Sequence, residues 1–182
     1  MLELSLHILD VAENSTRAGA KTVFITINED TVKDILSMEI RDDGSGMSED
    51  IINKAKDPFF TTKTVRNVGL GLPMLAQAAE RAGGKLIIES ECGKGTRVAA
   101  DFKLHHIDRQ PLGDISGTLV TLITGNAGVE FIYRHQHNDQ AYVLDTREIK
   151  KEIEDIPINH VDVLSFIRSH IIEGLEEIGA EA

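Results

Sequence analysis

Asp42 begins the group Asp42-Asp43-Gly44-Ser45-Gly46, which directly follows a predicted strand over 36–41. Gly44 and Gly46 allow the backbone to turn sharply where that strand ends. A carboxylate at such a turn can accept a hydrogen bond from the exocyclic amino group of adenine, whereas guanine offers a carbonyl there and would leave the charge unpaired. Asp-Gly turns also occur without any ligand, so the adenine hypothesis depends on further groups.

Gly69-Leu70-Gly71-Leu72 lies at the start of a helix predicted over 71–82. Glycines permit close approach of the backbone, and the free N–H groups at the positive end of a helix favour an anion. The alternative is an ordinary turn from loop to helix. With the neighbouring groups present, we expect Gly69, Leu70, Gly71 and Leu72 to contact phosphate groups.

A third group, Asp10-x-x-x-Asn14, lies within a helix predicted over 3–17. Residues four apart on a helix share a face. The polar side chains of this segment fall on one stripe: Glu3, His7, Asp10, Asn14 and Arg17. Apolar residues cover the rest of the circumference, so the stripe is either a solvated face or the wall of a cleft.

Two more groups complete the set, and they read Pro58-Phe59-Phe60-Thr61-Thr62-Lys63 and Gly93-Lys94-Gly95-Thr96. In this order the groups resemble the N, G1, F, G2 and G3 boxes of the ATPase family that unites gyrase, heat-shock chaperones, histidine kinases and MutL, the Bergerat fold. The resemblance covers residues 3 to about 103. It implies ATP with Mg²⁺ as the ligand.

The resemblance also assigns roles to single side chains. Asn14 matches the magnesium ligand, and one neutral ligand is enough because Mg²⁺ keeps waters and phosphate oxygens. Thr96 matches a residue that shares the adenine contact through a water. Phe60, Thr62 and Lys63 belong to the lid, where the lysine would neutralise the γ-phosphate.

The chain departs from the family pattern at two positions. Asp10 stands where gyrase-like, MutL-like and anti-sigma-kinase-like members have a glutamate as general base, and histidine kinases commonly have an asparagine there. Aspartate is shorter by one methylene, about 1.5 Å of reach, so Asp10 is expected to be a weak base at most. Asn67 replaces the first glycine of the usual Gly-x-Gly-Leu-Gly-Leu motif. Asparagine tolerates a left-handed backbone.

The order of predicted elements indicates the fold class. Helices are expected over 3–17, 48–56 and 71–82, and strands over 21–28, 36–41, 85–90 and 96–102. This α-β-β-α-loop-α-β-β order predicts an α/β (α+β) two-layer sandwich with a mixed, mostly antiparallel sheet and helices on one face.

The remainder of the chain carries no motif that we can assign. We expect an ATP-binding domain over 1–104, a linker over 105–117 and a small α+β extension over 118–182. The extension is expected to hold three short strands, over 118–124, 129–135 and 140–144, and two helices, over 146–155 and 161–178. His135 and His137 could ligate a metal, but two histidines alone are a weak signal.

Composition excludes several classes of protein. The net charge of −11 would repel a nucleic-acid backbone, and no long apolar run predicts a membrane span. We therefore expect neither nucleic acid nor a membrane as partner. The first residues lack the basic region of a signal peptide, and the single cysteine, Cys92, cannot form an internal disulfide. These features indicate a cytoplasmic protein.

Three functional hypotheses remain open. The first is a stand-alone signalling protein that transfers the γ-phosphate of ATP to a partner such as a response regulator or a sigma-factor regulator. The second is a binding module that ATP switches without chemistry, and the third is a MutL-like ATP hydrolase, which the acidity and the short Asp10 disfavour. No histidine lies in the phosphoacceptor pattern of a histidine kinase, and no paired-helix dimerisation segment precedes the motifs. A homodimer remains compatible with the sequence.

Overall fold

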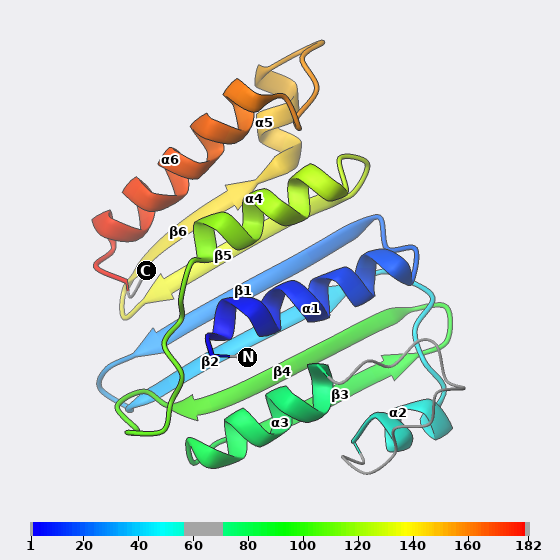
Figure 1. Ribbon diagram of the computed structural model, residues 1–182, viewed down its shortest axis with the longest axis vertical. Coiled ribbons are helices and arrows are strands. Elements are labelled where there is room, and N and C mark those ends of the chain that lie inside the picture. Colours follow the sequence, from blue (N-terminus) through cyan, green and yellow to red (C-terminus); the bar gives the residue numbers. More distant parts are fainter. Residues whose placement is uncertain (1, 57–70, 181–182) are drawn as a thin grey trace.

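The computed structural model describes residues 2–56 and 71–180 of the chain (Figure 1). The helices are α1 (Leu4–Arg17), α2 (Glu49–Lys56), α3 (Gly71–Arg81), α4 (Ile115–Gly125), α5 (Thr146–Glu152) and α6 (Val161–Glu177). The strands are β1 (Thr22–Asp30), β2 (Ile35–Asp42), β3 (Lys85–Glu91), β4 (Gly95–Lys103), β5 (Glu130–His137) and β6 (Gln140–Asp145).

The six strands form one mixed sheet in the order β3-β4-β2-β1-β5-β6. β1 and β5 run parallel, and the other neighbouring strands are antiparallel. The helices lie over one face of this sheet (Figure 1). The predicted α+β two-layer sandwich with a mostly antiparallel sheet is therefore confirmed.

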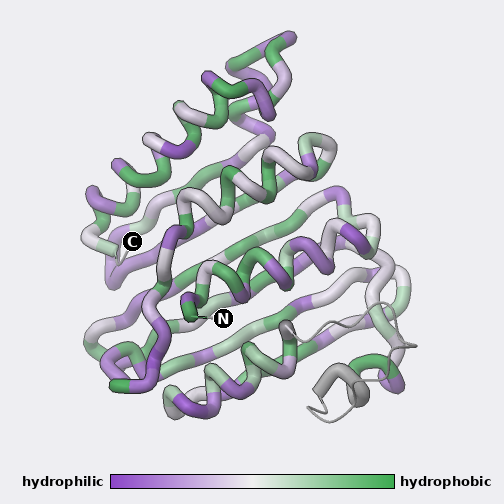
Figure 2. Tube along the Cα trace, in the orientation of Figure 1, coloured by the Kyte–Doolittle hydropathy of each residue, from purple (hydrophilic) through white to green (hydrophobic). Residues whose placement is uncertain are grey.

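Alternation along the strands explains why one face is covered. Val23, Ile25 and Ile27 of β1 are buried, whereas Phe24 between them is partly exposed. Side chains of a strand point to opposite faces in turn, so Val23, Ile25 and Ile27 meet the helices while Phe24 faces outward. In Figure 2 hydrophobic colour runs along much of α4, while α1 mixes hydrophobic and hydrophilic segments. α1 thus combines a core-facing side with polar positions.

The predicted strand over 118–124 is wrong, because this segment lies inside helix α4. Its β-branched residues suggested a strand, but tertiary packing overrides such a propensity. Asp114 caps the helix by accepting a hydrogen bond from the Gly117 N–H at 2.7 Å. Leu119, Leu122 and Ile123 recur at helical spacing and are buried. Residues 115–180 therefore hold two strands and three helices.

Residues beyond 104 continue the same sheet. β5 pairs with the central strand β1 over eight residues, from Thr22 opposite Glu130 to Glu29 opposite His137. Helix α4 packs beside α1 over the sheet (Figure 1). The predicted boundary near residue 104, between an ATP-binding domain and a C-terminal extension, stays a prediction.

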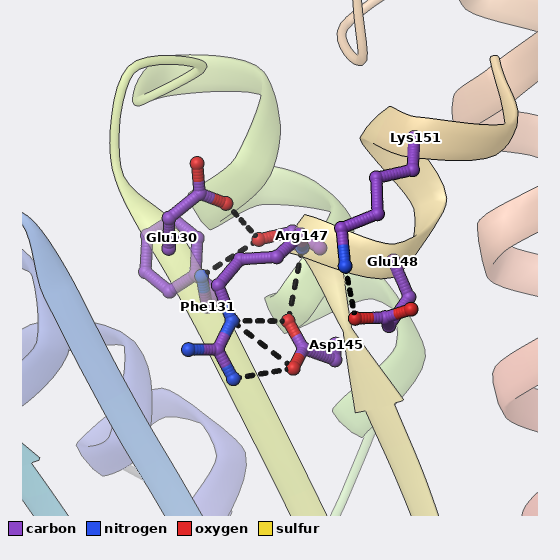
Figure 3. A network of polar contacts seen from close by, with 7 residues as sticks. Glu130, Phe131, Asp145, Arg147, Glu148 and Lys151 are labelled. Carbon is purple, nitrogen blue, oxygen red and sulfur yellow. Dashed lines mark hydrogen bonds and ion pairs between the residues drawn. The ribbon is translucent and has the colours of Figure 1, made fainter. Parts of the chain in front are cut away.

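The junction between β6 and α5 is held by a polar network that includes Glu130, Phe131, Asp145 and Arg147 (Figure 3). The Thr146 hydroxyl accepts a hydrogen bond from the Phe131 N–H at 2.9 Å and donates to Glu130 at 2.7 Å. Asp145 caps α5 by accepting from the Arg147 N–H at 2.9 Å, and its carboxylate also pairs with the Arg147 guanidinium. These contacts join the start of α5 to β5.

Candidate functional site

Asp42 lies at the end of β2 with only 7% of its surface exposed. Its Oδ2 accepts a hydrogen bond from the Ser15 hydroxyl at 2.6 Å. Its Oδ1 accepts from the backbone N–H groups of Gly44 at 2.9 Å and Thr96 at 3.2 Å. Three donors from three segments fix the carboxylate, and none of them is a cation.

Two glycines allow the chain to close around Asp42. Gly95 has φ +96°, and a Cβ there would lie 2.0 Å from the backbone oxygen of Asp42. Gly46 has φ +66°, and a Cβ there would lie 2.0 Å from the backbone oxygen of Glu91. Only glycine combines this conformation with this proximity. The two predicted glycine turns are thus packed against each other at one end of the sheet.

Ser90 connects these turns to Thr96. Its hydroxyl accepts a hydrogen bond from the Met47 N–H at 2.8 Å and donates to the Gly95 carbonyl at 2.9 Å. It also lies 2.8 Å from the Thr96 hydroxyl. This network fixes the hydroxyl of Thr96, the residue whose backbone N–H bonds the Asp42 carboxylate.

Helix α1 carries Asp10 and Asn14. Asn14 is half-buried, and its Oδ1 accepts a hydrogen bond from Arg17 at 3.1 Å. Arg17 also forms an ion pair with Glu13 on the exposed side of the helix. The Asn14 carbonyl is a hard oxygen donor of the kind that Mg²⁺ prefers. The Arg17 side chain that engages this oxygen is itself 66% exposed.

Asp10 faces the start of α3. A Cβ on Gly71 would lie 1.6 Å from Asp10 Oδ2, so the carboxylate packs directly against the Gly71 backbone. Gly71 begins α3, and the free N–H groups at such an end favour an anion. Leu72 is buried in the core, so its side chain supports α3 from inside. Any contact of Leu72 with a phosphate would come from its backbone.

The remaining predicted site residues lie outside the described residues. They are Phe60, Thr62, Lys63, Gly69 and Leu70. Within the described part, α1, β2, α3 and β4 carry Asp10, Asn14, Asp42, Gly44, Gly46, Gly71, Leu72 and Thr96. Direct contacts join Asp10 to Gly71 and Asp42 to Gly44 and Thr96.

Ser15 was not among the predicted site residues. It is buried on α1, directly after Asn14, and its hydroxyl donates to Asp42 Oδ2 at 2.6 Å, with the Val11 carbonyl of the preceding turn as a more distant acceptor at 3.3 Å. The sequence signal was present, because a serine one position after Asn14 lies on the flank of the polar stripe. Its partner 27 positions later becomes evident only in the folded chain.

The family to which the chain is similar is indicated by its first part. A profile of the family described as "Histidine kinase-, DNA gyrase B-, and HSP90-like ATPase" matches residues 2–106. "Sensor kinase CckA" of Brucella abortus (strain 2308) is 42% identical over 64 residues, which are 35% of this chain and 7% of that protein. "Sporulation kinase E" of Bacillus subtilis (strain 168) is 39% identical over 74 residues, which are 41% of this chain and 10% of that protein.

Another relative is "Sporulation kinase C" of Bacillus subtilis (strain 168), 30% identical over 94 residues, or 52% of this chain and 22% of that protein. The matched parts thus make up less than a quarter of these relatives. Among solved structures, the "Aquifex aeolicus MutL ATPase domain complexed with ADP" superimposes with a TM-score of 0.52 at 17% identity, over 85% of this chain and 68% of that chain. The "N terminal domain of a DNA repair protein" gives 0.53 at 17% identity, over 80% and 53%. These likenesses concern the fold.

Proposed function

The chain belongs to the family of histidine kinase-, DNA gyrase B- and HSP90-like ATPases, and from this premise we propose that it binds ATP with Mg²⁺ and transfers the γ-phosphate to a partner protein. The partner would be a protein such as a response regulator or a sigma-factor regulator. The proposal separates into a binding step, which the described residues support directly, and a transfer step, which the relatives support.

The observation that carries the binding step is the fixed, buried Asp42 carboxylate. A carboxylate offers about four acceptor positions, and Ser15, Gly44 and Thr96 use three of them. The remaining capacity suits the exocyclic amino group of adenine. Guanine would bring a carbonyl oxygen against a buried negative charge, which is costly. We therefore propose ATP rather than GTP.

The phosphate end of the nucleotide would lie along α1 and α3. Asn14 would hold Mg²⁺, which when bound neutralises charge on the phosphate oxygens. The start of α3 at Gly71 would receive phosphates through backbone N–H groups. Lys63, which lies outside the described residues, would neutralise the γ-phosphate.

Transfer is favoured over hydrolysis by the short side chain at position 10. Glutamate would reach about 1.5 Å further toward an attacking water than Asp10 does. The relatives matched by sequence are kinases by name. Both features support a chain whose γ-phosphate acceptor is a protein side chain supplied by the partner.

Two alternatives have observations of their own. A MutL-like hydrolase is favoured by the fold likeness to the MutL ATPase domain. A non-catalytic switch is favoured by the contact between α1 and residues 105–114, because the N–H groups of Leu4 and Ser5 donate to the Pro111 and Leu112 carbonyls at 2.9 and 2.8 Å. Through this contact, ATP bound at α1 could alter the C-terminal part of the chain.

Incubation with ATP labelled in the γ-phosphate separates the three functions. The protein is tested alone and with the products of neighbouring genes, and an Asp42→Asn variant serves as the binding-deficient control. A labelled partner that disappears with Asp42→Asn supports the kinase. Free labelled phosphate without a labelled partner supports the hydrolase, and tight ATP binding without either product supports the switch.

A further inference from the structure

His7 is a buried polar residue of α1 that the proposed function does not use. It is 1% exposed, and its Nε2 lies 3.0 Å from the side-chain oxygen of Gln110. Burial lowers the pKa of the imidazole, although the Gln110 hydrogen bond and the Asp10 charge act in the opposite direction. The neutral imidazole donates from Nε2 to the Gln110 oxygen, so Nδ1 carries the lone pair.

Two polar atoms on this face of α1 are buried and have no hydrogen-bond partner among the described residues, His7 Nδ1 and Asp10 Oδ2. His7 and Asp10 are three positions apart, so their side chains are neighbours on the helix. Helical side chains lean toward the N-terminus, which directs the Asp10 carboxylate over the turn that carries His7. Both atoms are acceptors, and acceptors require a shared donor rather than a direct bond.

We propose that His7 is a positioning residue for Asp10, in which His7 Nδ1 and Asp10 Oδ2 share one water as hydrogen-bond donor and thereby fix the carboxylate beside Gly71. A water has two protons and can satisfy both acceptors at once. This inference rests on the proposed function, because the orientation of Asp10 matters only if nucleotide chemistry takes place at α1 and α3.

The opposite side of the carboxylate is bounded by α3. Asp10 Oδ2 packs against Gly71 so closely that even a Cβ would not fit. The Gly71 backbone therefore bounds the Asp10 side chain on one side, and the proposed water on His7 would bound it on the other. A shift of about 1 Å at a reacting group can change a rate a hundredfold.

Gln110 extends this arrangement to the segment after β4. Its side chain fixes which ring nitrogen of His7 carries the proton. The neighbouring carbonyl of Pro111 accepts the Leu4 N–H and so holds the first turn of the same helix. Residues 105–114 thus orient both the start of α1 and the His7 imidazole.

Two substitutions at His7 distinguish positioning from packing. His7→Gln keeps a polar group at the place of Nε2 and loses the one at Nδ1, whereas His7→Asn keeps a group at Nδ1 and loses the contact with Gln110. We expect His7→Gln to lower kcat for phosphate transfer or release about tenfold with an ATP Kd within twofold of the parent. His7→Asn should restore most of kcat. A purely structural role predicts the reverse, with His7→Asn the more impaired variant, and that result would overturn the proposal.

A second measurement does not depend on nucleotide. Two-bond ¹H–¹⁵N spectra of the imidazole report its tautomer and titration in the full chain, in the parent and in Asp10→Asn. The proposal expects the Nε2–H tautomer, and it expects the pKa of His7 to fall in Asp10→Asn because the carboxylate raises it. An unchanged His7 titration overturns the proposal. If the parent binds no ATP, the proposed function fails, while these spectra still decide whether His7 and Asp10 are coupled.

Discussion

Two buried acids in one sheet, Asp42 and Glu29, have opposite surroundings. Asp42 at the end of β2 is held by a hydroxyl and backbone N–H groups, and no described cation pairs with it. Glu29 near the end of β1 bonds the His135 imidazole at 2.6 Å. A carboxylate held by neutral donors keeps some acceptor capacity for a ligand. A carboxylate engaged by a buried imidazole belongs to the internal structure of the protein.

The network around Glu29 uses both nitrogens of His135. The Tyr133 hydroxyl donates to Nδ1 at 2.6 Å, and Nε2 donates to Glu29. Burial raises the pKa of Tyr133 well above its ordinary value, so the hydroxyl remains a neutral donor. His135 is fully buried and has no nitrogen left for a metal. The weak hypothesis of a metal held by His135 and His137 is therefore wrong.

The largest expected effect comes from adding a methyl group at Gly95. Gly95→Ala would place its Cβ against the Asp42 backbone at positive φ, so we expect a loss of at least about 4 kcal/mol in unfolding free energy and no ATP binding. Urea unfolding and calorimetry measure both. Gly93→Ala is the matched control, because Gly93 has φ +78° but open space around its Cβ. It should cost about 1 kcal/mol, and equal losses for the two variants would contradict the account.

An intermediate effect is expected in the Glu29 network, and it should be confined to stability. His135→Phe keeps the ring but removes both hydrogen bonds, which should cost about 3 kcal/mol of unfolding free energy. Tyr133→Phe removes only the hydrogen bond from the Tyr133 hydroxyl to His135 Nδ1 and should cost about 1 kcal/mol of unfolding free energy. ATP affinity, measured by calorimetry below the unfolding transition, should stay within twofold. A large loss of ATP affinity in either variant would contradict the distinction between a ligand site at Asp42 and a structural network at Glu29.

The smallest effect is expected at Ser15. Ser15→Ala removes one donor to Asp42, which should lower ATP affinity about tenfold and stability by about 1 kcal/mol. Thr16→Ala is the control, because the Thr16 hydroxyl bonds the Glu13 carbonyl on the same helix and does not reach Asp42. Unaltered affinity in Ser15→Ala, or an equal loss in Thr16→Ala, would remove Ser15 from the site.

The two regions also differ in how far the sequence predicted them. Asp42, Gly44 and Gly46 form a contiguous group, so local turn chemistry predicted the end of β2 correctly. The contacts of Ser15 and His7 were not predicted, because their partners, Asp42 and Gln110, lie 27 and 103 positions away in the sequence. Only folding brings these residues together. In the C-terminal part, the strand predicted over 118–124 was wrong. β-branched residues favour strands, but the Asp114 cap and the buried side of α4 stabilise a helix there.

The part of the chain after β4 was predicted as a small extension, and its attachment could not be deduced from its sequence. Its strand β5 pairs with β1 in parallel, and a parallel neighbour across such a connection leaves no turn motif to recognise. The motifs alone therefore indicated neither the continuous six-stranded sheet nor the buried network of Glu29, His135 and Tyr133.

The central claim is that the buried Asp42 carboxylate recognises adenine. Calorimetric titration of the parent and of Asp42→Asn with ATP in the presence of Mg²⁺ tests it most directly, with GTP as the control ligand. We expect ATP to bind the parent and GTP to bind it at least about a hundredfold more weakly. We expect Asp42→Asn to lose about a hundredfold in ATP affinity, because its amide N–H groups would face the adenine amino group, which is itself a donor. An unchanged dissociation constant for ATP in Asp42→Asn would contradict the account.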